Sequence, residues 1–299
     1  MLLTDGGLET DLIFNHNIEL EQFAAFPLLE NDEQRQVLKN YYIDYLEIAK
    51  KHQSGFVLES PTWRANLGWG KELGYTSDQL IKVNTDAISL MKKLRDRYKD
   101  LLPEIHISGQ IGPKGDGYVV GGTMTSNEAA DYHSLQVKAF KNAGADMVTA
   151  ITMTYIDEAL GVVQSALHHK IPVVISFTVE LDGNLPSGEG IKEAIEVIDA
   201  KTNSYTSYYM INCAHPTHFL DILKDDGAWK SRIKGIRANA STMSHEELDE
   251  CEELDAGDKQ LLSEGYQELN KLLPNLKIIG GCCGTDHSHI AHICDHILK

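Results

Sequence analysis

The chain has 299 residues, of which 42% are hydrophobic and 24% are charged, a composition typical of a globular protein rather than a disordered or fibrous one. Its net charge of -17 disfavours nucleic acids and anionic membrane surfaces as partners, because their phosphates would repel it. The start Met1–Gly7 lacks a basic segment before an apolar run, and no later stretch approaches the roughly 20 apolar residues of a membrane span, so a cytoplasmic protein is expected.

Short runs with the composition of β-strands follow one another along the chain, and each ends in small or polar residues. The predicted strands are Leu2–Thr4, Gly55–Glu59, Glu104–Ile111, Met147–Thr152, Pro172–Thr178, Tyr208–Cys213, Gly235–Asn239 and Leu276–Cys282. Strands that are separated by helical crossovers run parallel within one sheet.

Helical patterns lie between these runs. The segment Asp32–Lys51 has apolar residues at spacings of three and four, which suits a helix with one buried face. The other predicted helices are Thr76–Asp100, Asn127–Ala143, Asp157–His168, Gly190–Thr202, Asp258–Leu273 and Asp286–Leu298. Eight parallel strands that alternate with helices close most naturally into an α/β (β/α)8 TIM barrel, so residues 1–299 are predicted to form a single domain.

Functional residues of such a barrel should lie at the C-terminal ends of its strands. The chemically active residues of this chain follow that rule. The residues found at predicted strand ends are Asp5, Glu9, Glu59, Gly109–Gly112, Cys213, Asn239, Cys282 and Cys283. Because these ends meet at one face of a barrel, we expect the side chains to share one site.

The cysteines give the most specific signal. Packing explains the vicinal pair Cys282–Cys283 at a strand end poorly, and Cys213 also ends a predicted strand. Three thiolates on one Zn2+ ion, with a fourth position left open, form a catalytic rather than a structural site. The remaining cysteines, Cys251 and Cys294, are interpreted as packing residues.

Three motifs resemble the zinc-dependent homocysteine S-methyltransferase family of the single-domain, cobalamin-independent type. They are Thr4–Thr10 with its Asp-Gly-Gly turn, Asn212-Cys213, and Gly280–Thr285 with the sequence Gly-Gly-Cys-Cys-Gly-Thr. The resemblance covers nearly the whole chain.

The resemblance implies a barrel enzyme in which Cys213, Cys282 and Cys283 hold zinc and the thiol of homocysteine becomes the fourth ligand. Coordination removes the thiol proton, and the sulfur then takes a methyl group from a small donor to give methionine. The partners are therefore a small-molecule thiol and a methyl donor, and a homo-oligomer is possible.

Substrate contacts are expected from Asp5, Gly6 and Asn212. In the Asp-Gly-Gly turn the glycines let the backbone approach a ligand closely. The family uses this motif, so Asp5 is interpreted as a substrate-binding residue rather than as a turn aspartate only. Asn212 either orients a loop or hydrogen-bonds the substrate.

Two stretches depart from the family. Its members carry a Glu after the fourth strand that contacts the amino group of homocysteine, and this chain has Ile151 there, which cannot bind a cation. The second strand is followed by Ser-Pro-Thr-Trp-Arg, so Glu59 could supply the missing carboxylate and Arg64 could receive a substrate carboxylate. Alternatively, Glu59 and Arg64 form an ion pair with each other that shapes the loop.

Weaker signals concern the methyl donor and the barrel mouth. A cage for a cationic donor could be formed by Trp63, Trp69 and Trp229, although tryptophans more often serve in packing. The glycine-rich segment 112–122 is interpreted as a loop over the mouth. Histidines near the C-terminus could suggest a metal-dependent hydrolase, but a solvated helix face explains His292 and His296 better.

The favoured donors are S-methylmethionine and S-adenosylmethionine, because the chain has no room for folate and cobalamin modules after its last motif; betaine is a weaker candidate. Two alternatives stay open. The acceptor could be a different small thiol or a selenol, or the barrel could bind zinc or a thiol without turnover.

Overall fold

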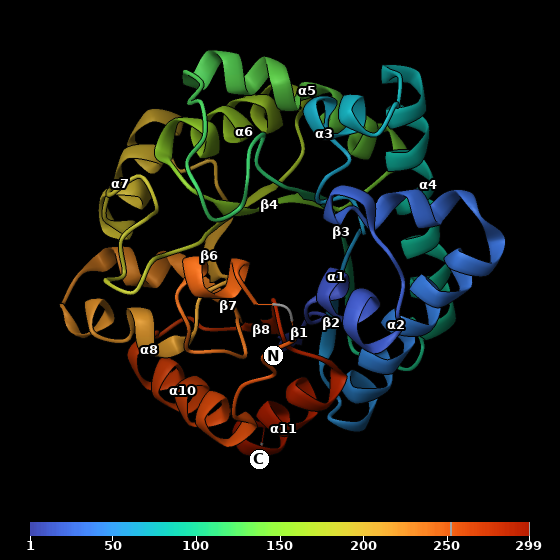
Figure 1. Cartoon of the computed structure of the whole chain (residues 1–299). Helices are drawn as coiled ribbons and strands as arrows, with labels where there is room; N and C mark the ends of the chain where they lie inside the picture. Colours follow the sequence, from blue (N-terminus) through green and yellow to red (C-terminus); the bar gives the residue numbers. More distant parts are fainter. Residues whose placement is uncertain (252, 299) are drawn as a thin grey trace.

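The structure of the chain, a computed structural model, describes residues 1–251 and 253–298. Its strands form one closed barrel in which each strand pairs in parallel with the next and β8 pairs with β1 (Figure 1). The strands are β1 (Leu2–Leu3), β2 (Gly55–Glu59), β3 (Ile105–Ile111), β4 (Met147–Met153), β5 (Val173–Phe177), β6 (Tyr208–Asn212), β7 (Ile233–Ala238) and β8 (Ile278–Gly281). The predicted TIM barrel is confirmed.

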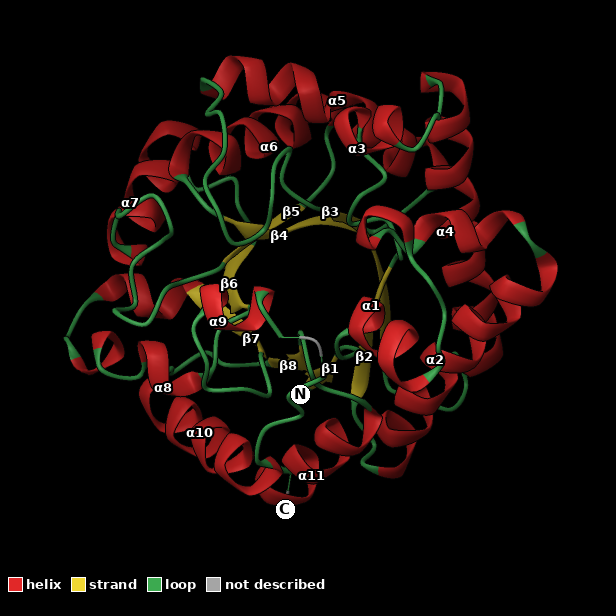
Figure 2. Ribbon diagram, viewed as in Figure 1, coloured by secondary structure: helices red, strands yellow, loops and turns green. Residues whose placement is uncertain are grey.

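Helices surround the ring of strands, as the red ribbons around the yellow arrows of Figure 2 show. The α-helices are α1 (Leu8–Thr10), α2 (Asp32–Lys51), α3 (Leu67–Glu72), α4 (Ser77–Tyr98), α5 (Ser126–Ala143), α6 (Ile156–His169), α7 (Ile191–Thr202), α8 (Pro216–Phe219), α9 (His245–Asp249), α10 (Lys259–Leu272) and α11 (His287–Ile297). Short 3-10 or π segments cover Asp11–Asn15, Glu21–Phe23, Phe26–Glu30, Ile222–Lys224 and Ala228–Arg232.

The ends of the predicted helices differ from the observed ends mainly at caps. Thr76 and Asp286 were included in helices, yet both have extended backbone and act as N-caps of α4 and α11. Thr76 accepts a hydrogen bond from the amide of Gln79, and its own amide donates to the Gln79 side chain. Such reciprocal bonds satisfy amides at the helix start that have no partner within the helix.

The barrel interior has an apolar floor and a polar upper part. Val174, Met210 and Ile278 form a separate buried cluster inside the barrel. Two residues further along β5 and β6, the inward side chains are Ser176 and Asn212, which hydrogen-bond each other at 2.6 Å. The large core lies instead between strands and helices. Polar groups are therefore gathered toward the C-terminal ends of the strands.

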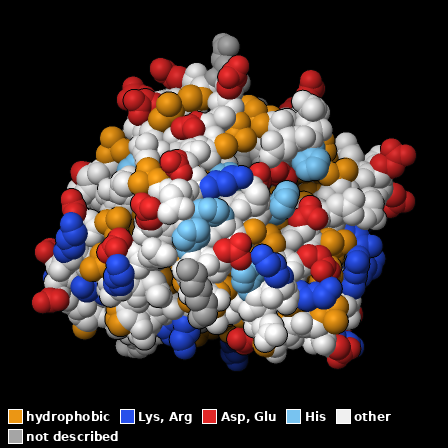
Figure 3. All heavy atoms as spheres, turned by 90° about the horizontal axis from the view of Figure 1, so that it is seen from below, with side chains coloured by type: hydrophobic (Ala, Val, Ile, Leu, Met, Phe, Trp, Pro, Cys, Tyr) orange, Lys and Arg blue, Asp and Glu red, His pale blue; other side chains and the backbone are white. Residues whose placement is uncertain are grey.

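The helices α1 and α9 lie over the ring of strands and inside the ring of larger helices (Figure 2). Both contribute to the lining of one cavity at the C-terminal strand ends, α1 through Leu8–Thr10 and α9 through Asp249. On the face drawn in Figure 3, acidic side chains are spread from top to bottom, whereas basic and histidine side chains lie mainly in the middle and lower parts. None of the helices in the described ranges is both long and apolar enough to span a membrane.

Candidate metal centre

Three cysteine sulfur atoms converge at the C-terminal ends of β6 and β8. The Sγ atom of Cys213 lies 3.0 Å from that of Cys282 and 3.5 Å from that of Cys283, and all three lie within 4.8 Å of one another. Sulfur atoms that are each about 2.3 Å from a tetrahedral zinc lie about 3.8 Å apart, so the observed set fits a single ion. Within residues 1–251 and 253–298, this is the one cluster of potential metal ligands, and the predicted convergence is confirmed.

The backbone around Cys213 is held from two sides. Its φ of 57° lies in the left-handed region, which residues other than glycine rarely adopt. The amide of Cys213 donates to the carbonyl of Arg237 at 3.0 Å, and its carbonyl lies 2.8 Å from Nε2 of His245. Backbone strain of this kind persists only where the surroundings impose it, and it is concentrated at functional sites.

Hydrogen bonds also reach the sulfur atoms themselves. Asn212 approaches Sγ of Cys282 at 3.8 Å, and the Tyr118 hydroxyl donates to Sγ of Cys283 at 3.3 Å. Contacts with Cys213 and Cys283, aided by the charge of Arg237, lower the pKa of Cys282 well below the usual thiol value. The pKa of Cys213 is raised by its contacts with the other two thiols, and that of Cys283 is also raised, so these electrostatics favour one thiolate among the three sulfur atoms. A metal binds thiolates, and its positive charge would favour loss of the other two protons.

Asn212 does not line the cavity in front of the cysteines. Its side chain accepts from the amide of Thr152 at 2.9 Å and from Ser176, and it donates to the Thr152 hydroxyl and to Cys282. These contacts fit a residue that positions the metal-binding loop. The predicted contact with substrate has no support in this geometry.

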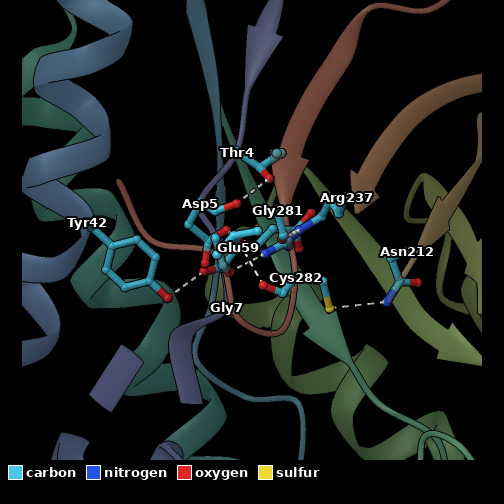
Figure 4. A network of polar contacts seen from close by, with 12 residues as sticks. Thr4, Asp5, Gly7, Tyr42, Glu59, Asn212, Arg237, Gly281 and Cys282 are labelled. Carbon is cyan, nitrogen blue, oxygen red and sulfur yellow. Dashed lines mark hydrogen bonds and ion pairs between the residues drawn. The ribbon is translucent and has the colours of Figure 1, made fainter. Parts of the chain in front are cut away.

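Asp5 lies beside a buried arginine that the sequence interpretation missed. Arg237, on β7, places Nη2 at 2.9 Å from Oδ1 of Asp5, and both side chains are 3% exposed (Figure 4). Arg237 also donates from Nε to the carbonyl of Gly281 and from Nη2 to that of Gly6. The arginine thus joins the ends of β1, β7 and β8 directly behind the cysteines. Its sequence signal was an Arg between Ile236 and Ala238, near the end of the predicted strand Gly235–Asn239.

Burial and nearby carboxylates shift the pKa of Arg237 in opposite directions. Burial alone would lower its pKa, but the nearby carboxylates of Asp5 and Glu59 raise it above the usual arginine value. The arginine therefore stays positive. Burial raises the pKa of Asp5, and the charge of Arg237 opposes this rise. Asp5 and Gly6 both line the cavity, as predicted, but the Asp5 charge already has a partner.

Glu59 is buried close to Asp5 and Arg237 (Figure 4) and is not among the residues that line the cavity. Burial raises its pKa to about 7, although Arg237 acts in the opposite direction, and its Oε2 has no hydrogen-bond partner among the described residues. The alternative interpretation as an ion pair with Arg64 is wrong. The acidic partner of Arg64 in this structure is Asp116, at 3.7 Å.

Arg64 is placed on the cavity wall by two aromatic rings. Its guanidinium carbon lies 4.5 Å from the ring centre of Trp63 and 3.7 Å from that of Trp69. The interpretation of three tryptophans as a cage for a cationic donor is wrong for this geometry, since Trp63 and Trp69 contact the protein's own cation. Trp229 lines a different cavity with Asn184.

The glycine-rich segment lies over the barrel mouth, as expected. Its residues Asp116, Gly117 and Tyr118 line the cavity. The ring of Tyr118 stacks on His245 with centroids 4.1 Å apart, while its hydroxyl lies 3.4 Å from Sγ of Cys213. Tyr118 thereby forms part of the wall beside the sulfur atoms, which the sequence interpretation did not anticipate.

The cavity has a volume of about 250 Å³, which suits a small molecule. Besides the cysteines, its wall includes Ile151, which is 6% exposed, and the half-buried Glu9. Burial raises the pKa of Glu9 to about 7. Ile151 therefore presents a hydrocarbon side chain to the cavity.

Comparisons with known proteins agree with this picture. A family model described as homocysteine S-methyltransferase matches residues 2–297. Homocysteine S-methyltransferase 1 of Arabidopsis thaliana is 24% identical over 316 residues, which cover 96% of this chain and 90% of that protein. Selenocysteine Se-methyltransferase of Brassica oleracea var. italica is 22% identical over 321 residues, covering 99% and 89%.

Solved structures with the same fold include the homocysteine methyltransferase MmuM from Escherichia coli. Its oxidised form has a TM-score of 0.79 at 17% identity and covers 99% of this chain and 95% of that one. The metallated form has a TM-score of 0.77 at the same identity, covering 98% and 95%. The barrel of this chain is thus shared over nearly its full length.

Proposed function

We propose a specific reaction for this chain, which belongs to the homocysteine S-methyltransferase family: the zinc-dependent transfer of a methyl group from a small donor to homocysteine, giving methionine. The observation that carries the proposal is the convergence of Cys213, Cys282 and Cys283 on the wall of one cavity. The named activity of the relatives supports homocysteine as the acceptor. A zinc ion bound there would lower the pKa of the acceptor thiol and hold the thiolate in place.

The residues around the cysteines would fix the ligand set. Hydrogen bonds from Asn212 and Tyr118 to two of the sulfur atoms orient the thiolates and compensate part of their charge. Arg237 holds the carbonyl of Gly281, which precedes the cysteine pair. These groups keep the site in one arrangement, so that binding an acceptor requires little reorganisation.

A second cavity supports a cationic methyl donor. Its volume is about 240 Å³, and it adjoins the first because Tyr118 and Cys283 line both. Three carboxylates, from Asp249, Glu253 and Asp255, contribute to its wall, and none of its described lining residues is a lysine or an arginine. A sulfonium such as S-methylmethionine or S-adenosylmethionine would be attracted there, whereas an anionic donor would be repelled.

The test is to measure zinc content and methionine formation together. We expect one zinc per chain and methionine from homocysteine plus a sulfonium donor. In Cys282→Ser, both zinc binding and turnover should fall at least about 100-fold, because a ligand is lost. The control is Cys294→Ala, a buried cysteine away from the cluster, which should keep zinc. Turnover by zinc-free protein would contradict the proposal.

The family makes the chain a methyltransferase, so a non-catalytic zinc-binding barrel is set aside. A second acceptor class remains a candidate because of two observations: Ile151 lines the cavity, and Asp5 is already paired with Arg237. A different thiol or a selenol therefore belongs in the same assay. A cytoplasmic location is part of the proposal, since a reducing compartment keeps such thiols available for zinc.

A further inference from the structure

The charged groups of the cavity are unequally available to a ligand. Asp5, a buried carboxylate that lines the cavity, is paired at 2.9 Å with Arg237, and Tyr41 donates to its other oxygen at 3.2 Å. Oδ2 of Asp5 thus accepts from Tyr41, and Oδ1 lies in an ion pair with Arg237 without a hydrogen bond among the described residues. The neighbouring arginine would repel a substrate cation. An α-ammonium group placed beside Asp5 would have to compete with a fully buried guanidinium.

The opposite wall of the cavity, at Ile151, offers no other carboxylate that could bind the ammonium group. Ile151 presents only carbon atoms, and its neighbour Thr152 hydrogen-bonds with Asn212 through both its amide and its hydroxyl. Neither of these side chains contains a carboxylate, so this wall offers no negative charge to an ammonium group. The two places that would bind an ammonium are therefore closed, one by an internal ion pair and one by hydrocarbon.

Arg64, by contrast, has donor capacity to spare. It is 8% exposed, it lines the cavity, and its Nε has no hydrogen-bond partner among the described residues. Its pair with Asp116 is long, at 3.7 Å, and Asp116 also accepts from the amide of Tyr118 at 2.7 Å. The rings of Trp63 and Trp69 lie close to the guanidinium and restrict its movement, as is favourable for binding a carboxylate through two parallel hydrogen bonds.

Two further carboxylates on the cavity wall provide weaker sites for a cation. Asp249 is exposed at the outer edge, on the cavity side of α9. Glu9 is half-buried, and burial raises its pKa to about 7, so much of it is uncharged at neutral pH. Glu9 is the residue that could still oppose the inference, and it is therefore included in the test.

We propose that the acceptor is recognised by a carboxylate at Arg64 and needs no α-ammonium group, so that simple mercapto acids are methylated at least as well as homocysteine. This inference rests on the proposed function, because it concerns the acceptor of the same site. The thiol loses its proton to solvent as the thiolate forms. The sulfur then bonds to the methyl carbon while the bond from that carbon to the donor sulfonium breaks, and the donor leaves as a neutral sulfide.

The experiment compares three thiols of matched length on zinc-loaded protein: 4-mercaptobutyrate, homocysteine and 3-aminopropane-1-thiol. Calorimetry measures their dissociation constants without a donor, and kcat/KM is then measured with S-methylmethionine and S-adenosylmethionine. We expect 4-mercaptobutyrate to bind at least as tightly as homocysteine. The aminothiol should bind at least about tenfold more weakly, because it cannot use a hydrogen bond to a charged guanidinium.

Two arginine variants separate recognition from structure. Arg64→Gln should weaken both carboxylate-bearing thiols at least about tenfold and leave the aminothiol and the zinc content unchanged. Arg95→Gln is the matched control, since Arg95 also pairs with an aspartate, at 3.0 Å, but on the surface. It should leave all three dissociation constants as they are.

The inference would be overturned if homocysteine bound more than tenfold more tightly than 4-mercaptobutyrate. Loss of that preference in Glu9→Gln would then identify Glu9 as the residue that binds the ammonium group. Equal weakening of all three thiols by Arg64→Gln would also overturn it, because the arginine would then only shape the cavity. If the thiols bind in the expected order but no donor methylates them, the proposed function fails and the recognition of the carboxylate stands. If no thiol binds, both fail.

Discussion

The buried side chain of Arg237 limits which ligands the Asp-Gly-Gly turn can bind. The Asp-Gly-Gly turn places Asp5 on the cavity wall, but Arg237 from β7 occupies one of its oxygens and also binds the carbonyls of Gly6 and Gly281. Removing one partner of such a buried pair would leave an uncompensated charge. At this scale, the function of Asp5 depends on a residue more than 200 positions away in the chain.

Glu59 provides a prediction about pH at the residue scale. Burial raises its pKa from 4.5 to about 7, so the folded protein keeps a proton that the unfolded chain has already lost between these values. The folded state binds more protons, and stability therefore falls as pH rises from about 5 to 7. In Glu59→Gln this loss should disappear, which makes the variant gain about 2–3 kcal/mol relative to the parent between pH 5 and pH 8.

Denaturant unfolding of both proteins with a chelator present, at pH 5 and at pH 8, measures this difference. The comparison between pH values removes the constant effect of the amide on packing. A stability difference between Glu59→Gln and the parent that stays the same at both pH values would show that Glu59 is ionised throughout this range.

At the scale of elements, β8 must pack very closely against its neighbours. A Cβ atom at Gly280 would overlap the hydroxyl of Thr4, and one at Gly281 would overlap that of Thr285. Thr285 cannot move freely, because its hydroxyl donates to the carbonyl of Cys282 at 2.7 Å. The glycine pair thus lets the strand end approach β1 and sets the position of the cysteine pair that follows.

Gly281→Ala should therefore cost about 1–3 kcal/mol in unfolding free energy, the usual range for overpacking. It should also weaken zinc binding, because the displaced threonine hydroxyl supports the loop that carries Cys282 and Cys283. Gly121→Ala is the control, since a Cβ there meets no atom within 4 Å. Equal effects of the two substitutions in urea unfolding would show that backbone entropy, and not the close approach, decides the result.

For the molecule as a whole, the barrel separates stability from chemistry. An apolar cluster of Val174, Met210 and Ile278 fills its floor, while polar side chains gather at the C-terminal strand ends around the cavity. The three cysteines come from β6 and β8, which flank β7 in the closed sheet. A metal bound by all of them would cross-link parts of the chain separated by about seventy residues.

Metal binding should accordingly stabilise the folded state. With free zinc about 1,000-fold above its dissociation constant, the expected gain is about 4 kcal/mol, seen as a rise of several degrees in Tm. A chelator should reverse the rise. Calorimetric scans of the parent and of Cys283→Ser with and without zinc measure it, and an equally large rise in the variant would place the stabilising ion at another site.

Sequence patterns alone predicted the eight strands, the seven longer helices and the convergence of Cys213, Cys282 and Cys283, because a parallel barrel brings all C-terminal strand ends to one face. The short helices α1, α3, α8 and α9 were not predicted. The local hydrophobic periodicity identifies the strands and helices, and the order of the strands predicts which strand ends lie close together. The predicted ends were wrong by one or two residues, mainly where capping residues such as Thr76 were counted as helix.

The tertiary structure decided which charges meet. Asp5 pairs with Arg237, Arg64 contacts two tryptophans and pairs with Asp116, and Glu59 is buried away from the cavity wall. These outcomes depend on side-chain directions and distances between segments that are remote in sequence, and Coulomb interactions in a buried site vary steeply with both. The sequence alone thus determined the barrel and its three-thiol cluster, whereas only the folded packing determined how the surrounding cavity distributes its charge.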